Sequence, residues 1–346
     1  MNIKSLLLGS AAALAVVSGA QAADAIVAAE PEPMEYVRVC DAFGTGYFYI
    51  PGTETCLKIG GEVRVTLSAN ENSGLFGTTT TNDDWDSAVR ARLSFEAKND
   101  SELGTIGSYI RIQADSQGAT TSGVGVTLDQ AYITVGGFKV GRAVTFADDW
   151  GLAGESDSFF GNTKFNMASY TYSADAFTVG LGIDDLSDSG AVAGTPGFLG
   201  GGNEVGLEGV VSASLGMATV TVNGVYDFGS EEGAIAGVIA ADVGPGTFAL
   251  AAAWASGQST GYDFTSEWTV GAAYTFKATD KLSITPQVVY WGDYGFNAAG
   301  NDAWGADLLV EYKLAAGLTA SADVRYRDLE NSGDNWDGFV RLTRSF

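Results

Sequence analysis

From residue 57 to the end of the chain, apolar and polar residues alternate in segments of about ten residues. Residues 57–67 place Leu57, Ile59, Val63, Val65 and Leu67 on one face and Lys58, Glu62, Arg64 and Thr66 on the other. Residues 88–97, 106–114 and 318–327 repeat the pattern. Alternation with a period of two is typical of β-strands that have one apolar and one polar face. The pattern therefore predicts an all-β protein over residues 57–346.

The connections between these segments differ in length. Residues 278–280 and 314–317 are short turns, whereas 70–84, 186–202, 257–266 and 331–335 are longer and rich in Gly, Ser, Thr, Asn and Asp. Outer-membrane barrels have short periplasmic turns and long outer loops. Counting hairpin by hairpin predicts sixteen antiparallel strands, and the weak patterns at 168–183 and 233–241 leave this count open by two.

Alternation alone does not separate a soluble sandwich from a membrane barrel, because both have one apolar face. Two features favour the barrel. The polar faces carry arginine pairs, Arg90 with Arg92 and Arg325 with Arg327, which suit a wet wall. The apolar faces at 249–253 and 272–273 are rich in alanine, and a sandwich core needs more bulk than this.

The N-terminus has the features of a secretory signal peptide. Lys4 precedes an apolar run over residues 5–17, and Ala20-Gln21-Ala22 is a small-x-small cleavage site. We therefore expect residues 1–22 to be a signal peptide and residues 23–56 to be a periplasmic arm that carries a disulfide loop. Cys40 and Cys56 are the only cysteines, and in an oxidising compartment one pairing is available to them. The alternative is two free thiols.

Composition limits the possible functions. The net charge is −24, which argues against nucleic acid as a partner, because its phosphates need Lys and Arg. The chain contains no histidine, so Ser-His-Asp catalysis and His-ligated metal sites are excluded. Paired carboxylates could still act as acid and base, but no spacing singles out a pair. We expect no enzyme, no metal and no cofactor.

The longest irregular stretch after the fifth strand is residues 143–167, which follow Gly141-Arg142. Loops of this length in compact folds are usually functional or disordered. Aromatic residues among the acids suggest packing, so we expect a loop folded inward to narrow the pore; the alternative is an exposed surface loop. Its acidic candidates are Asp148, Asp149, Glu155 and Asp157.

Basic residues of the first strands are the expected opposite wall of this constriction. They are Lys58, Arg64, Arg90, Arg92 and Arg111, with Arg142 at the base of the loop. An acidic loop facing basic strands would create a transverse field that orders water and admits small polar solutes. The alternative is that these arginines simply pair with Glu62 and Glu96.

Residues 39–64 read VCDAFGTGYFYIPGTETCLKIGGEVR, and the chain closes with GFVRLTRSF. Both stretches closely resemble the general porins of alphaproteobacteria. The resemblance implies a sixteen-stranded transmembrane barrel in outer-membrane lipid, a homotrimer, a third loop folded into each pore, and passive diffusion of small hydrophilic solutes and ions. The match is weaker over 190–202 and 229–244.

Three other interpretations compete with a porin. They are a plugged structural or adhesive barrel, a secreted soluble β-protein such as a lectin, and, last, an enzyme. Ion selectivity depends on two opposing features, because the net charge favours cations at the mouth and the arginines favour anions at the narrowest point. We expect a weak cation preference.

Overall fold

The computed structural model describes residues 38–70, 85–118, 124–148, 151–156, 164–187, 204–262, 264, 266–296 and 300–346. The expected signal peptide, residues 1–22, lies outside this part of the chain, so it stays a prediction. Among the described residues, no helix is long and apolar enough to cross a membrane.

Sixteen strands build the fold, and a two-residue strand, β1 (Phe48–Tyr49), precedes them. They are β2 (Cys56–Asn70), β4 (Trp85–Ser101), β5 (Gly104–Gln117), β6 (Val126–Val135), β7 (Phe138–Val144), β8 (Lys164–Ser173), β9 (Phe177–Asp185), β10 (Val205–Ser214), β11 (Ala218–Asp227), β12 (Glu232–Val243), β13 (Gly246–Ala255), β14 (Ser266–Lys277), β15 (Leu282–Tyr294), β16 (Ala303–Ala315), β17 (Leu318–Leu329) and β18 (Gly333–Ser345).

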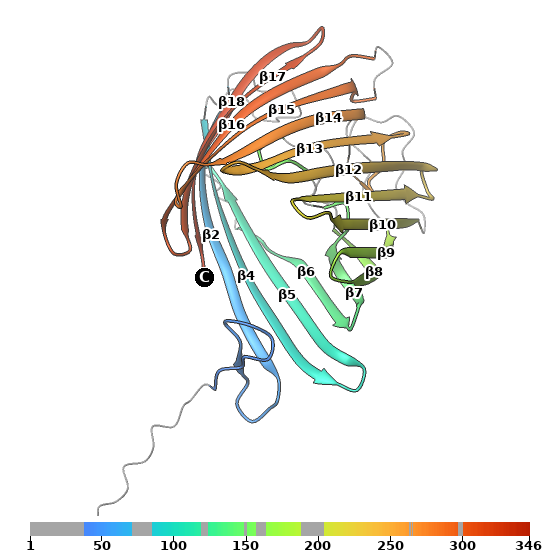
Figure 1. Ribbon diagram of the computed structural model, residues 1–346, viewed down its shortest axis with the longest axis vertical. Helices are drawn as coiled ribbons and strands as arrows, with labels where there is room; N and C mark the ends of the chain where they lie inside the picture. Colours follow the sequence, from blue (N-terminus) through green and yellow to red (C-terminus); the bar gives the residue numbers. More distant parts are fainter. Residues whose placement is uncertain are drawn as a thin grey trace, which may run out of the picture. The chain divides into compact units, whose positions relative to one another are not determined.

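Each of these strands pairs antiparallel with the next one along the chain, and Figure 1 shows them in consecutive colours around the sheet. The sheet closes because β18 pairs with β2, from Asp337 opposite Asn70 to Ser345 opposite Glu62. Closure satisfies the backbone hydrogen bonds of both edge strands. The predicted sixteen-stranded antiparallel barrel is confirmed.

The two ends of the barrel have different connections. At one end, only two to four residues separate consecutive strands, as between β4 and β5 or β16 and β17. Gly317 in the latter turn has φ +67°, a left-handed conformation that glycine adopts without a Cβ clash. The longer connections lie at the other end. Two connections at that end are also short, 228–231 between β11 and β12 and 330–332 between β17 and β18. The second corrects an expectation, because residues 333–335 of the predicted long loop 331–335 belong to β18.

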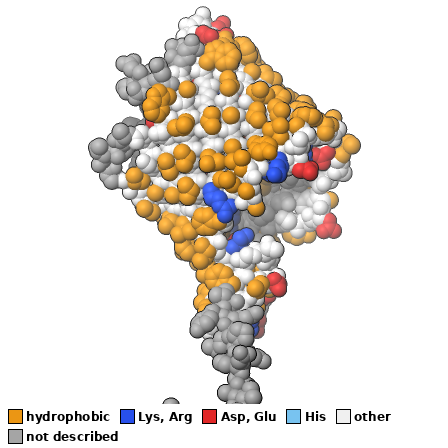
Figure 2. Space-filling model, turned by 90° about the vertical axis from the view of Figure 1, so that its left-hand side faces the viewer, with side chains coloured by type: hydrophobic (Ala, Val, Ile, Leu, Met, Phe, Trp, Pro, Cys, Tyr) orange, Lys and Arg blue, Asp and Glu red, His pale blue; other side chains and the backbone are white. Residues whose placement is uncertain are grey.

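Side chains alternate between the outside of the barrel and its lumen. Val63, Val65 and Leu67 of β2 are exposed on the outside, and the apolar residues of the neighbouring strands continue this surface (Figure 2). The alanines of β13 behave differently from our expectation. Ala251 and Ala253 face the lumen and are buried there. Their small side chains therefore leave room for packing inside the barrel, and they do not form a surface toward lipid.

A hairpin precedes the first long strand. Its strand β1 pairs with β2 where β2 extends beyond the end of β18, so it covers an edge that would otherwise be free. The predicted Cys40–Cys56 disulfide is confirmed, with Cα atoms 5.9 Å apart, and Cys56 is itself the first residue of β2. Tyr47 packs on this disulfide, and burial raises the pKa of its phenol.

The alternation of the faces can be tested at Ile239, which lies on the outside of β12 and is 48% exposed. Ile239→Arg should destabilise the barrel in a bilayer by about 2–4 kcal/mol, the cost of a lipid-facing cation near the membrane centre. Ser283→Arg is the control, since Ser283 lies on the lumen row and bonds Glu311. Urea unfolding of both variants in lipid vesicles measures the difference, and equal destabilisation would contradict the assigned faces.

Candidate functional site

The loop after β7 turns into the barrel at Phe146. The backbone N–H of Phe146 donates to the carboxylate of Glu208 on β10, and its carbonyl accepts from Asn223 Nδ2 on β11 at 2.9 Å. Glu208 and Asn223 lie on the lumen face and are almost fully buried. These bonds direct the chain across the lumen and away from the rim.

The tip of the loop is fixed on the far wall. Gly154 N donates to Gln287 Oε1 of β15 at 2.8 Å. Glu155 N and Ser156 N donate to the two carboxylate oxygens of Asp307 on β16, at 3.1 and 3.3 Å. A Cβ on Gly154 would lie 2.5 Å from Asp307 Oδ2, so this approach requires glycine. The loop therefore spans the lumen from β7 to β16.

Two arginines hold the same tip from the next strands. Arg325 Nη1 of β17 donates to the Glu155 carbonyl at 3.0 Å, and Arg341 Nη1 of β18 pairs with the Glu155 carboxylate at 2.9 Å. Charge-assisted bonds of this kind are stronger than neutral ones. The Glu155 carboxylate thus fastens the loop to the wall in addition to carrying charge.

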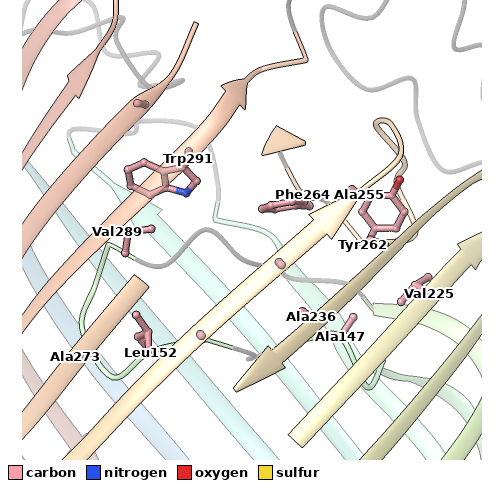
Figure 3. Close-up of a cluster of buried hydrophobic side chains, with 14 residues drawn as sticks. Ala147, Leu152, Val225, Ala236, Ala255, Tyr262, Phe264, Ala273, Val289 and Trp291 are labelled. Carbon is pink, nitrogen blue, oxygen red and sulfur yellow. The ribbon is translucent and has the colours of Figure 1, made fainter. Parts of the chain in front are cut away.

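Apolar packing fills the space behind the loop. Ala147 and Leu152 belong to one buried cluster with lumen-facing residues of β12–β15, among them Val289 and Trp291 (Figure 3). Gly271 leaves room for Leu152, because a Cβ there would lie 2.9 Å from its Cδ1. This half of the lumen is packed like a protein core, so the open passage is displaced toward the other half.

The connection between β13 and β14 also folds inward. Tyr262 and Phe264 are buried in the same cluster, and Figure 3 places them beside Ala255. The Tyr262 hydroxyl donates to the Gly257 carbonyl at 2.5 Å, and burial raises the pKa of this phenol. We expected only a polar outer loop at 257–266. Its aromatic residues, Tyr262 and Phe264, are the sequence feature that could have predicted inward packing.

Arginines of β2, β4 and β5 line the wall that faces the loop. Arg64 pairs with Glu62 at 3.1 Å, and Arg90 pairs with Asp115 at 2.7 Å. Arg92 donates to Gln113 at 2.6 Å. Their side chains keep 21–34% of their surface exposed, so they are in contact with the aqueous lumen.

Two further contacts complete this wall. Arg111 pairs with Asp129, which also bonds Lys164 at 3.0 Å. Asp129 is the extra residue of a β-bulge in β6 and is buried on the lumen side next to Gln130. The bulge turns both side chains inward. It brings a carboxylate to Arg111 that regular alternation would have placed outside.

Arg64 and Arg90 stand directly opposite each other on neighbouring strands. Like charges in such a cross-strand pair destabilise a sheet. Carboxylates beside each arginine and water in the lumen reduce the repulsion. Stability alone does not account for this pair, which favours a functional role for the wall.

The register separates two of the predicted basic residues from this wall. Lys58 lies six residues before Arg64 on β2, about 20 Å along the strand, and its Nζ is 5.7 Å from the ring centroid of Tyr47. Arg142 pairs with Ala131 and Asn166 on the outward row that contains Phe138 and Val140. Both residues therefore leave the predicted constriction, Lys58 because of its distance along β2 and Arg142 because it lies on the outward row.

The acidic candidates divide in a similar way. Glu155 and Asp148 lie on the inward loop, and Asp148 follows a turn in which its N–H donates to the Thr145 carbonyl at 3.3 Å. Asp149 and Asp157 lie outside the described residues. Sequence reasoning missed Arg341 as a partner of the loop, although pairing of the last strand with the first places it beside Arg64.

The described residues contain no group of three or more His, Cys, Asp or Glu side chains that could hold a metal ion. What the described lumen residues offer is a field between fixed charges of the loop and of the wall.

Comparisons with known proteins agree with this geometry. The sequence profile of the porin subfamily matches residues 24–340. An outer membrane protein of Sinorhizobium fredii is 46% identical over 100% of this chain and 99% of its own length. Outer membrane protein IIIA of Rhizobium leguminosarum is 41% identical over 98% of this chain and 93% of its own. Porin Omp2a of Brucella melitensis is 35% identical over the full length of both chains.

Solved structures show the same fold at low sequence identity. The channel DcaP of Acinetobacter baumannii has a TM-score of 0.64 and 14% identity, over 86% of this chain and 99% of that chain. A porin variant from Rh. blastica has a TM-score of 0.60 and 20% identity, over 84% and 100%. The trimer form of OmpT from Vibrio cholerae has a TM-score of 0.61 and 16% identity, also over 84% and 100%.

The anchor of the loop tip can be tested at Asp307. Asp307→Ala removes the acceptor for two loop N–H groups, so the loop should fluctuate and single-channel recordings should show more frequent current steps. Asp328→Ala on the neighbouring strand is the control, since Asp328 lies on the outward row of β17 that contains Val324. Recordings of Asp307→Ala as quiet as those of Asp328→Ala would contradict the anchoring role.

Proposed function

Because the chain belongs to the porin family, it forms a channel across the cell outer membrane, and we propose that its constriction lies between the inward loop and the arginine wall. The inward loop comprises the described residues 145–148 and 151–156, and the arginine wall comprises Arg64, Arg90, Arg92 and Arg111, with Arg341 joining the wall to the loop tip. The observation that carries this proposal is the pair of contacts from Asp307 and Arg341 to Glu155 at the loop tip. They hold the loop within the lumen and opposite the wall.

Passage through such a constriction is passive. A field between basic strands and an acidic loop orders water and favours small dipolar solutes and ions over large apolar ones. No step requires a cofactor or a chemical reaction. We propose small hydrophilic solutes and ions as the permeating class.

Selectivity follows from two opposing charge distributions. The net charge of −24 enriches cations near the mouth, and the arginine wall attracts anions at the narrowest point. We propose a weak cation preference of the whole pore, which the wall reduces. The proposal leaves out Arg142, which lies on the outward row.

A plugged barrel with a structural or adhesive role is the second candidate. The observation in its favour is the buried cluster of the two inward loops, which fills one half of the lumen. Planar-bilayer recording separates the candidates, because an open pore gives stepwise current and a plugged barrel gives none.

We also propose that the protein assembles as a homotrimer. One protein of the same fold has been solved in a trimer form. On this chain, an apolar groove of about 790 Å³ lies on the outer surface, beside the end of β2, the start of β4 and the middle of β17 and β18. Trp85 and Trp336 flank it, and Ala69 and Gly338 are among the small residues that line it. We place a contact between copies in this groove.

Selectivity tests the wall directly. Arg92→Ala should raise the potassium-over-chloride permeability ratio by about tenfold, since a unit charge about 6 Å from a passing ion contributes roughly 0.7 kcal/mol in water, against potassium and in favour of chloride. Folding should be unaffected, because exposed charge pairs contribute little stability. Arg142→Ala is the matched control and should leave the ratio unchanged. Reversal potentials in a potassium chloride gradient measure both, and equal ratios for the two variants would rule out the assigned wall.

Filling the groove tests the trimer. Ala69→Trp should obstruct the contact and shift the detergent-solubilised protein from trimer to monomer. Ala272→Trp, also on an outward row but far away on β14, should leave the assembly intact. Light scattering gives the mass of each variant. A trimer that survives Ala69→Trp would place the contact elsewhere, and a monomeric wild-type protein would refute the assembly.

A further inference from the structure

Two tyrosines stand side by side on the lumen face of β5 and β6, next to the arginine wall. Tyr109 pairs with Tyr132 across these strands, and their rings stack with centroids 5.1 Å apart. On its other side Tyr109 stands opposite Glu96, which shares the lumen row of β4 with Arg92. Tyr109 lies two residues from Arg111, toward the short-turn end, which is periplasmic in an outer-membrane barrel. A solute that leaves the arginine wall for the periplasm therefore meets this pair next.

The hydroxyl groups of the pair are not used by the protein. Tyr109 and Tyr132 are half-buried, and within the described part of the chain neither hydroxyl has a hydrogen-bond partner. The carboxylate opposite Tyr109 is occupied, because Glu96 pairs with Lys98 at 2.5 Å. Tyrosine hydroxyls usually find a partner when they are buried. This pair instead offers two O–H groups and apolar ring surface to the lumen.

A cation without a carboxylate flanks the pair. Lys139 of β7 stands opposite Ser169 of β8, which is buried on the lumen side, and its Nζ lies 5.4 Å from the centroid of the Tyr132 ring. Among the described residues, no carboxylate forms an ion pair with this ammonium. Lys98 and Arg111 differ in this respect, since each has a carboxylate partner. Lys139 is therefore the cation of this part of the wall that can accept an anion without giving up a partner.

A structural role alone does not account for this arrangement. The contact between Lys139 and the Tyr132 ring is a cation–π interaction and stabilises the ammonium. It leaves the N–H donors of the ammonium without an acceptor, and it does not explain two unbonded phenol hydroxyls. A half-buried charge of this kind is unfavourable unless something pairs with it. The three side chains together favour a visiting anion.

We propose that Tyr109, Tyr132 and Lys139 form a binding site for small aromatic carboxylates on the periplasmic side of the constriction. The Lys139 ammonium pairs with the carboxylate of the solute, and the phenol hydroxyls donate to its oxygens. The ring of the solute packs against the tyrosine rings. The site rests on the proposed passage along the arginine wall, and it adds a preferred class of solute to it.

The test measures the block of single-channel current in planar bilayers by three anions. Benzoate carries a carboxylate and a ring, acetate carries the carboxylate alone, and inorganic phosphate has no apolar surface. Benzoate should reduce the wild-type current, and half-block by acetate should need about fivefold more anion, the effect of losing one aromatic contact. Phosphate should block no better than acetate does.

Variants separate the two parts of the site. Lys139→Gln should raise the benzoate concentration for half-block by about fivefold, the upper range for an exposed ion pair, and Lys139→Arg should restore the wild-type value. In Tyr109→Leu/Tyr132→Leu, benzoate should block no better than acetate. Lys313→Gln removes another lumen-row cation, opposite Thr319 on β17, and should be blocked as wild type is.

Several results would overturn the proposal. Equal block of wild type by benzoate and acetate would exclude recognition of the ring, and stronger block by phosphate would show a general anion site. A Lys139→Gln channel that is less stable to heat but blocked by benzoate as wild type is would leave Lys139 with the cation–π contact only. A conducting channel that benzoate does not block refutes this site alone, whereas a protein without any current refutes the passage as well.

Discussion

Backbone hydrogen bonding in hydrocarbon is the constraint on which this structure depends. Every N–H and C=O within the membrane must find a partner in the protein, so a sheet in that setting has to close. Closure here joins β18 to β2. It brings the last two strands beside the first two, and with them Arg341 beside Arg64. The wall that faces the loop is thus made by both ends of the chain, and the anchor of the loop tip, Arg341 with Glu155, exists only in the closed barrel.

Closure also leaves a wide lumen that the protein fills unevenly. On the side of β12–β15, alanines and Gly271 admit two loops whose apolar side chains are buried against the wall. On the side of β2, β4 and β5, long charged side chains remain in contact with water. The same strand architecture therefore supports a packed core and a passage. What separates them is side-chain size on the lumen rows, since the small residues let the loops pack against the wall, whereas the long side chains of β2, β4 and β5 stay in the water.

Local patterns in the sequence contained most of the fold. Alternation predicts the strands, the turns predict their number, and two cysteines in an oxidising compartment predict the disulfide, all of which the structure bears out. The site was harder to predict. The loop tip contacts Gln287, Asp307 and Arg341, which are 133 to 186 residues away in sequence, and no local pattern marks such pairs. The bulge at Asp129 and the outward row of Arg142 depend on register, which a list of charged residues does not reveal.

The position of Arg64 opposite Arg90 shows where the protein gives up stability. A cross-strand pair of like charges is unfavourable, and a lumen row could carry serine or threonine at no such cost. Glu62 and Asp115 reduce the repulsion without removing the positive charges from the water. In a chain with a net charge of −24, cations at this place cannot be explained by composition. The arrangement makes sense for a passage whose field acts on what moves through it, because a field in water requires charges that stay hydrated and close together.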